Sequence, residues 1–180
     1  MNFWSLINAL GLLSTLDAHC LTTTAIVEDE NGIASLECWK FTQPLQKYPT
    51  IGMSLPLANV SNVTYVALPP RSGEGIHNPP HPMLFVLLSG LAHITLPNGA
   101  DEAWVMEGVN GLLVAADTVG EGHYTDYPSD KTTVALQIPF ENGIIPPHKI
   151  VHLGACKSPN QIISNDPGVE LSFARLQYEL

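Results

Sequence analysis

The order of apolar and polar residues along the chain predicts a series of short β-strands joined by turns. Residues 83–88 are apolar at every position, so we predict a strand covered on both faces, as in the wall of a closed sheet. Ser89 and Gly90 form a tight turn, and residues 91–96 are predicted to return antiparallel. A glycine-rich loop, residues 71–82, precedes the strand, and its prolines exclude a helix because proline lacks an N–H donor.

Further alternating or apolar runs predict strands before and after this region. They are residues 22–27, 33–41, 62–68, 102–106, 112–116, 132–138 and 170–178. Asn31-Gly32, between the first two runs, is a strong hairpin signal. The proline-bearing segment 43–56 and the tail from Glu141 are expected to be mainly loops. With 15 prolines and 14 glycines in 180 residues, the pattern favours an all-β sandwich or barrel over a helical fold.

Composition limits the classes of function. A chain of 180 residues has the length of one domain with a full hydrophobic core. Acidic residues outnumber basic ones 17 to 7, which gives a formal net charge of −10. With so few lysines and arginines, the sequence does not predict a basic surface that would bind nucleic acid or an anionic membrane. The expected partners are therefore small apolar molecules, held in a barrel with a polar loop at its mouth.

The N-terminal residues differ from the rest of the chain. Residues 3–16 are mostly apolar but too few to span a bilayer, and Ala18-His19-Cys20 resembles a signal-peptidase site. We therefore expect residues 1–20 to be a cleaved signal peptide and residues 21–180 to be the mature domain. The protein would then enter the lumen of the secretory pathway or be secreted. A buried N-terminal helix is the alternative.

Two further features agree with secretion. Asn59 and Asn62 each begin an N-glycosylation sequon. Cleavage after Cys20 would leave Cys38 and Cys156, an even number that suits one disulfide. Two buried free thiols are the alternative for this pair.

Residues 59–140 resemble the cupin family of small jelly-roll barrels. Cupins carry a first motif with a glycine, a His-x-His pair, a glutamate and a hairpin glycine, and a second motif with a glycine-rich turn, a proline and a histidine. The run FVLLSG, residues 85–90, matches the first hairpin, which puts Met83 where a metal-binding glutamate belongs. The run GLLVAA, residues 111–116, matches the second strand, and His123 takes the place of its histidine.

The resemblance implies a single cupin-type jelly-roll barrel with N-terminal and C-terminal strand extensions, and a homodimer that pairs through edge strands. Only one of the four usual metal ligands is retained in register, and a thioether is a poor substitute for a carboxylate. We therefore expect no metal and no other cofactor. A three-histidine metal site formed by His77, His81 and His123 is the alternative.

If the side of Met83 faces inward, as in cupins, then Met83, Phe85 and Leu87 line the cavity, and antiparallel pairing adds Ala92 and Ile94. The interior is then a mostly apolar pocket with a few polar groups at its mouth. The polar candidates are Tyr65, Arg71, Glu74, His77, His81 and His123.

The run VSNVTYVALPPRSGEG…HPMLFVLLSGLAHITLP…VAADTVGEGHYTDYPSD also resembles fungal small secreted cupin-like proteins that include the hetero-Diels–Alderases of tropolonic sesquiterpenoid biosynthesis. The resemblance implies that a tropolone-derived ortho-quinone methide is joined to a humulene-type olefin. Such a reaction needs a proton donor, a donor that polarises the tropolone oxygens and an apolar wall. We assign His123 as the general acid and Arg71 as the polarising donor. The predicted substrate-binding residues are Trp39, Tyr65, His81, Met83, Phe85, Leu87 and Trp104.

Two other classes of function compete with this hypothesis. One is a metal-dependent cupin oxygenase or isomerase, which would require the histidine site described above. The other is a non-catalytic secreted protein that binds an apolar ligand. The sequence is compatible with both of these classes as well as with the hetero-Diels–Alderase.

Overall fold

The computed structural model describes residues 19–99, 101–108, 110–158 and 161–164. The predicted signal peptide therefore lies mostly outside the described residues, and so does the strand predicted at 170–178. His19 and Cys20 begin strand β1 (His19–Glu28), where they pair with β14 (Ile162–Ser164). Within the described ranges, no helix is long and apolar enough to cross a membrane.

Strands make up almost all of the regular structure in the described part of the chain, which confirms the predicted all-β class. The other strands are β2 (Ala34–Phe41), β3 (Gln46–Lys47), β4 (Met53–Ser54), β5 (Thr64–Leu68), β6 (Ser72–His77), β7 (Met83–Ser89), β8 (Leu91–Thr95), β9 (Glu102–Met106), β10 (Leu112–Ala115), β11 (His123–Tyr127), β12 (Thr133–Pro139) and β13 (His148–Leu153). A 3₁₀ turn, η1 (Glu141–Gly143), follows β12. The Asn31-Gly32 signal is confirmed, because β1 and β2 pair as an antiparallel hairpin.

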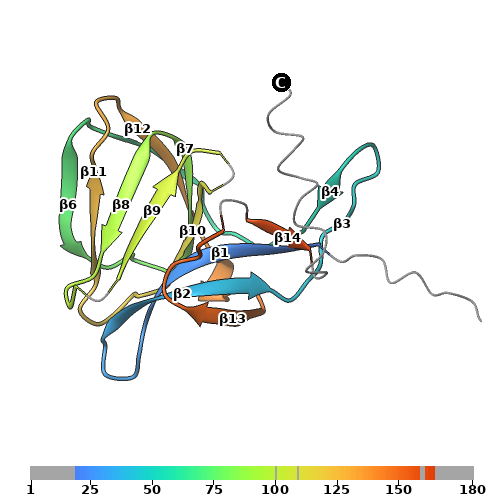
Figure 1. Ribbon diagram of the computed structural model, residues 1–180, viewed down its shortest axis with the longest axis horizontal. Coiled ribbons are helices and arrows are strands. Elements are labelled where there is room, and N and C mark those ends of the chain that lie inside the picture. The colour runs from blue at the N-terminus through green and yellow to red at the C-terminus, as the bar shows by residue number, and fades with distance from the viewer. Residues whose placement is uncertain (1–18, 100, 109, 159–160, 165–180) are drawn as a thin grey trace, which may run out of the picture.

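Two main sheets form the body of the molecule. The larger has the strand order β13-β2-β1-β10-β7-β12-β5, with β14 beside β1, and the smaller has the order β6-β11-β8-β9. Figure 1 shows β6, β11, β8 and β9 side by side at the left. Among the described residues neither order closes on itself, so the strand pairing gives two open sheets and not one closed wall.

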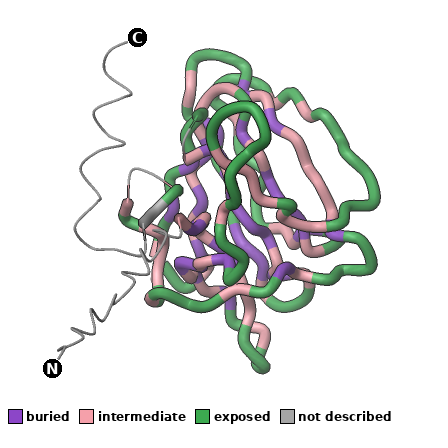
Figure 2. The backbone as a smooth tube through the Cα atoms, turned by 90° about the vertical axis from the view of Figure 1, so that its right-hand side faces the viewer, coloured by how far each residue is buried: buried purple, intermediate pink, exposed green. Residues whose placement is uncertain are grey.

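The two sheets share a hydrophobic core between their facing sides. Met83, Phe85 and Leu87 of β7 cluster there with Ala92 and Ile94 of β8. These five residues are the inward-facing set that the sequence predicted, and alternation along a strand explains why they share one side. Figure 2 shows the buried parts of the chain concentrated in the interior and the exposed parts in the outer loops.

Strand β7 is also covered on its other face, as predicted. Leu84 belongs to a second buried cluster with Trp39 of β2, Val114 of β10 and Phe140. Leu57, from the segment before β5, packs against this cluster. A central strand buried on both faces needs an apolar residue at every position, which residues 83–87 provide, whereas Leu88 near the end of the strand is half exposed.

The turn at Ser89 and Gly90 is present, but the prediction that β8 pairs with β7 is wrong. Strand β7 pairs with β10 and β12 in the larger sheet, whereas β8 pairs with β9 and β11 in the smaller one. Gly90 has a φ of 94°, and a Cβ there would lie 2.4 Å from the Thr133 hydroxyl oxygen. At Gly90, in tight contact with β12, the chain passes from the larger sheet to the smaller one.

Parts of the segments predicted as loops are strands. The glycine-rich region 71–82 contains β6, which pairs with β11, and the tail contains β13, which pairs with β2. The segment 43–56 contains the short pair β3 and β4. Glycine and proline lower the intrinsic strand preference of these segments, but pairing with an established neighbour overrides that preference.

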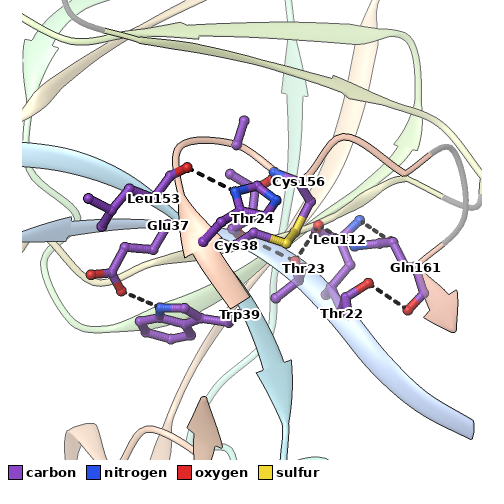
Figure 3. The surroundings of a disulfide bond; sticks show 12 residues. Thr22, Thr23, Thr24, Glu37, Cys38, Trp39, Leu112, Leu153, Cys156 and Gln161 are labelled. Atoms are coloured by element: carbon purple, nitrogen blue, oxygen red, sulfur yellow. Dashed lines mark hydrogen bonds between the residues drawn. A yellow bond between two sulfur atoms is a disulfide. The ribbon is translucent and has the colours of Figure 1, made fainter. Parts of the chain in front are cut away.

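A disulfide joins Cys38 of β2 to Cys156, which follows β13, so the structure contains the bridge and not two free thiols. The bridged segment is held by several hydrogen bonds, which Figure 3 shows. The Cys156 N–H donates to the Thr24 hydroxyl at 2.9 Å. The side-chain amide of Gln161 donates to the Leu112 carbonyl at 2.8 Å, so this segment also braces the parallel pair β1 and β10.

Candidate functional site

A pocket with a volume of about 190 Å³ lies between the two sheets. One part of its lining is apolar and comes from β7, β8, β10 and the loop before β7: Met83, Phe85, Ile94, Leu113, Ala115, Pro79 and Pro80. The other part is polar and comes mainly from β6 and β11: Glu74, His77, Asn78, His123, Thr125, Tyr127 and Gln137. A pocket with one apolar side and one hydrogen-bonding side suits a small, largely apolar molecule that carries a few oxygen atoms.

His123, at the start of β11, is tied to a buried carboxylate. Its Nδ1 lies 2.7 Å from Oδ2 of Asp117, and the two side chains are 5% and 0% exposed. Asn78 braces the loop that carries Asp117, because its amide donates to the Asp117 carbonyl at 2.7 Å. With Nδ1 engaged by Asp117, the other ring nitrogen of His123 is the one left for a molecule in the pocket.

The His123 ring lies beside a second imidazole. His77, at the end of β6, is the register partner of His123 across the β6–β11 pair. Their ring centroids are 4.5 Å apart, and the ring planes are tilted by 57°. Gly122 allows this approach, since it has a φ of 70° and a Cβ there would lie 2.4 Å from the His77 carbonyl oxygen.

Glu74 connects His77 to a buried phenol. One carboxylate oxygen of Glu74 lies 3.4 Å from Nε2 of His77, and the other accepts a hydrogen bond of 2.5 Å from the Tyr127 hydroxyl. Burial, with the neighbouring Glu74 carboxylate as the second cause, raises the pKa of Tyr127 well above its ordinary value. Tyr127 is therefore a permanent hydrogen-bond donor to Glu74 across the neutral pH range.

This raised pKa makes a prediction for alkaline titration. We expect Tyr127 to stay protonated in the folded protein at pH values where an ordinary phenol, with a pKa of about 10, has ionised. Tyr127→Phe should then leave the tyrosinate absorbance of the native protein unchanged, but lower it after unfolding. The contribution of this phenol to stability is complete below the unfolded pKa of about 10 and falls as the pH rises above it. A smaller native absorbance in the variant at mildly alkaline pH would contradict the assignment.

The structure brings only part of the predicted site together. Met83, Phe85 and His123 line the pocket. Leu87 is buried in the same core but does not line the pocket.

The other predicted substrate-binding residues lie elsewhere. Trp39 is buried on the far face of the larger sheet, where it stacks on His148. Trp104 is half exposed on β9 and stacks on His93. Tyr65 and His81 are exposed and are not among the residues that line the pocket. Trp39 and Trp104 point away because strand alternation puts them on outer faces.

Arg71 also lies outside the pocket lining. It occupies the turn before β6 with a φ of 52°, and its guanidinium contacts the Asp130 carboxylate at 2.6 Å. Both side chains are 74% exposed, as expected for a surface ion pair. The role of polarising a bound substrate, which the sequence assigned to Arg71, therefore has no support from its position.

This placement predicts that Arg71→Ala leaves the turnover of the reaction expected from the sequence within about twofold of the wild-type value, because a solvated ion pair contributes little. The matched variant Asp130→Ala removes the same contact from the other side, and it should behave alike. Steady-state kinetics of the two variants check the prediction. A drop of a hundredfold or more in Arg71→Ala alone would return Arg71 to the site.

Asp117 and Tyr127 are site residues that sequence reasoning missed. Asp117 lies six residues before His123, and Tyr127 lies on the same side of β11 as His123 and Thr125, since the three alternate along the strand. A correct prediction of β11 as a strand would have placed Tyr127 with His123. The contact between Asp117 and His123 depends on the path of the intervening loop, for which the sequence carries no periodic signal.

The alternative metal site is not assembled in the described ranges. His77 and His123 are neighbours, but His81 is exposed, and no group of three or more His, Cys, Asp or Glu residues in those ranges is placed to hold a metal ion.

Comparison with family models and with curated proteins finds no match to the sequence. Among solved structures, the chain is similar to a conserved protein of unknown function from Streptococcus pyogenes. The similarity covers 44% of this chain and 64% of that chain, with 22% sequence identity and a TM-score of 0.31. The chain thus matches less than two thirds of that protein's length, and an overlap of this extent defines neither a shared fold nor a shared chemistry.

Proposed function

We propose that the protein is an enzyme that transfers protons on a small, largely apolar substrate held between the two sheets. The observation that carries the proposal is the buried contact of His123 with Asp117, in which His123 lines a pocket whose other side is formed by Met83, Phe85 and Leu113. Burying a histidine and a carboxylate together costs desolvation energy. Such a pair beside a cavity is typical of acid–base sites.

The contact with Asp117 favours His123 as a proton acceptor. The carboxylate accepts the Nδ1–H of His123, which fixes the tautomer whose Nε2 carries a lone pair. The same carboxylate stabilises the imidazolium that forms when Nε2 takes a proton. We therefore propose that His123 is a general base, in place of the general acid predicted from the sequence.

The substrate class of the proposal comes from the resemblance to the cupin-like hetero-Diels–Alderases. A hydroxymethyl tropolone would lose water to give an ortho-quinone methide, which then adds to a humulene-type olefin. The elimination requires removal of the ring hydroxyl proton and cleavage of the C–O bond of the hydroxymethyl group. His123 is suited to the first of these steps, and Met83 and Phe85 offer the planar ring a thioether and an aromatic face.

The volume of the pocket limits what it encloses. At about 190 Å³ it is smaller than most sites for drug-sized ligands, which begin at about 300 Å³. We expect it to enclose the tropolone ring, with the olefin approaching from the side of Pro80, an exposed residue of the lining. Holding the two reactants in a reactive geometry is worth about 7 kcal/mol or more.

The finer fold assignment is also a proposal: the two sheets form a cupin-type jelly roll. Its support is that the strands from β5 to β12 divide equally, with β5, β7, β10 and β12 in the larger sheet and β6, β8, β9 and β11 in the smaller. Two four-stranded layers visited in this way are typical of a jelly roll. Strands β1, β2, β13 and β14 would then be the terminal extensions.

We further propose that the chain enters the secretory pathway and loses residues 1–20 there. Exposure of both sequon asparagines, Asn59 and Asn62, supports this, as does the Cys38–Cys156 bridge, because disulfides persist in oxidising compartments.

A homodimer is the expected oligomeric state. Strand β13 ends the larger sheet, and its Ile150, Val151 and Leu153 are exposed, so a second copy pairing along this edge would cover them. Light scattering on the purified protein should give twice the monomer mass, and Ile150→Lys should shift it toward the monomer. A monomer mass for the wild type at high concentration would contradict this prediction.

The activity is tested by incubating the purified protein with a hydroxymethyl tropolone and humulene. We expect faster formation of the adduct and one dominant stereoisomer. A rate and stereochemical composition equal to those without protein would contradict the proposal. Calorimetric binding of the tropolone without turnover would instead identify a ligand-binding protein. Activity that a chelator abolishes and that iron, manganese or zinc restores would identify a metal-dependent cupin enzyme.

A further inference from the structure

The polar side of the pocket holds titratable side chains that a single general base does not require. His77, Glu74 and Tyr127 form a second chain of contacts next to His123, in which Glu74 lies at ion-pair distance from His77 and accepts a hydrogen bond from Tyr127. We propose that His77 is the general acid of the site, and that Glu74 and Tyr127 are its positioning residues. This inference rests on the proposed function, and it assigns the second proton transfer that the loss of water requires.

The two imidazoles are placed to act on one small substrate. His77 and His123 are directly opposite in the β6–β11 pairing, both line the pocket, and their ring centroids are 4.5 Å apart. A hydroxymethyl group on the ring position next to a hydroxyl group brings its oxygen close to the hydroxyl oxygen. One such molecule can therefore reach both imidazoles at the same time.

The surroundings of the two rings favour opposite roles. Nδ1 of His77 faces the Gly75 carbonyl at 3.0 Å, and Nε2 faces the Glu74 carboxylate at 3.4 Å. The Gly75 carbonyl engages Nδ1, whereas the 3.4 Å contact of Nε2 with Glu74 is an ion-pair distance and not a hydrogen bond, so an Nε2–H beside this carboxylate remains able to donate to a molecule in the pocket. His123 has a carboxylate at Nδ1 alone, which leaves Nε2 as a base.

Tyr127 and Glu74 hold this arrangement in place. The buried Tyr127 hydroxyl donates to one oxygen of Glu74 at 2.5 Å, which orients the other oxygen toward His77. The titratable groups around His77 are Glu74 on its own strand, Tyr127 and His123 on β11, and Asp117, which reaches the pair through His123. No lysine or arginine lines this pocket in the described part of the chain, so the two histidines are the groups of its lining that can carry a positive charge.

The step balances as a loss of water. His123 takes the proton of the ring hydroxyl, and the electron pair left on that oxygen forms the carbonyl of the quinone methide. The C–O bond of the hydroxymethyl group breaks, and His77 gives its proton to the departing oxygen. His123 then releases a proton to solvent and His77 regains one, so the enzyme returns to its starting state. The preferred substrates are therefore rings with a hydroxyl group next to a hydroxymethyl group.

The test compares two substrates in His77→Gln. A hydroxymethyl tropolone needs a proton on its leaving group, whereas the acetoxymethyl analogue releases acetate without one. We expect the variant to lose about a hundredfold or more in turnover with the first substrate and to stay within about threefold of wild type with the second. Retained activity with the acetoxymethyl compound also shows that the variant is folded. Equal losses with both substrates, or no loss with either, would overturn the role of His77.

The pH profile separates an acid from a merely structural residue. The wild type should show a bell-shaped profile with the hydroxymethyl substrate, and His77→Gln should lose its alkaline limb, which reports deprotonation of the acid. Glu74→Gln and Tyr127→Phe should move that limb to lower pH, because each weakens the contact that favours protonated His77. An alkaline limb unchanged in all three variants would overturn the inference. Absence of turnover by the wild type with both substrates would instead refute the proposed function.

Discussion

Replacement of His123 by asparagine is expected to lower the turnover number of the proposed reaction by about two to four orders of magnitude, the range typical for removal of a general base. Asparagine is close in shape to part of the imidazole, and its amide can still donate to Asp117, so the wall of the pocket should be kept. The variant lacks the Nε2 lone pair that would take the ring hydroxyl proton. Single-turnover kinetics with the hydroxymethyl tropolone measures the loss at the elimination step.

The matched control is His93→Asn. His93 lies on β8 outside the pocket lining and contacts Glu102 at 2.7 Å, so it also loses an imidazole–carboxylate contact without touching the substrate. Its turnover should remain at the wild-type value. Equal activity of His123→Asn and the wild type would remove His123 from the mechanism, and thermal unfolding of both variants tells a lost base from a lost fold.

Removal of the Cys38–Cys156 bridge has the largest expected effect on stability. The two cysteines are separated by 118 positions, and closing a loop of this length restricts the unfolded chain strongly. We expect Cys38→Ser combined with Cys156→Ser to lower the free energy of unfolding by about 4 kcal/mol. Urea unfolding of the two proteins, followed by tryptophan fluorescence, measures the difference.

Reduction of the wild type provides the control for this experiment. With a thiol reductant present, the wild-type midpoint should fall to that of the double variant, while the midpoint of the double variant stays where it was. Coincident midpoints of oxidised wild type and variant would show that the bridge does not constrain the unfolded chain. Gln161→Ala leaves the disulfide intact and removes the side-chain hydrogen bonds to Leu112. Its unfolding midpoint therefore separates the contribution of these hydrogen bonds from that of the disulfide.

The hydrophobic pattern was sufficient for the core because burial and periodicity are local properties. An apolar residue at every position of 83–88 indicated a strand covered on both faces, and the two clusters around β7 confirm it. Which sheet the chain joins after Gly90 was not predictable in the same way. A tight turn is compatible with a hairpin and with a passage to another sheet, and the contact with Thr133 that decides between them is long-range.

Residues of the site were predicted only where the cupin resemblance or the hydrophobic pattern of the core indicated them. His123, Met83 and Phe85 were found in this way, while Tyr127 was missed because β11 was not recognised as a strand. Strand β6 was mistaken for a loop because its glycines weaken the strand signal, and its pairing with β11 depends on the whole sheet. Arg71 was chosen for its chemistry alone, and chemistry does not tell which side of a turn a side chain takes.

The passage of the chain from β7 to β8 gives the pocket two sides of different origin. Met83, Phe85 and Leu113 belong to one sheet, whereas the imidazoles of His77 and His123 belong to the other. The two residues of the proposed proton transfers thus stand on one layer, and most of the apolar lining stands on the other, with Ile94 of β8 as the apolar contribution from the smaller sheet. Under the proposed function, substitution of Met83, Phe85 and Leu113 is therefore expected to change which carbon skeletons bind while both imidazoles keep their positions.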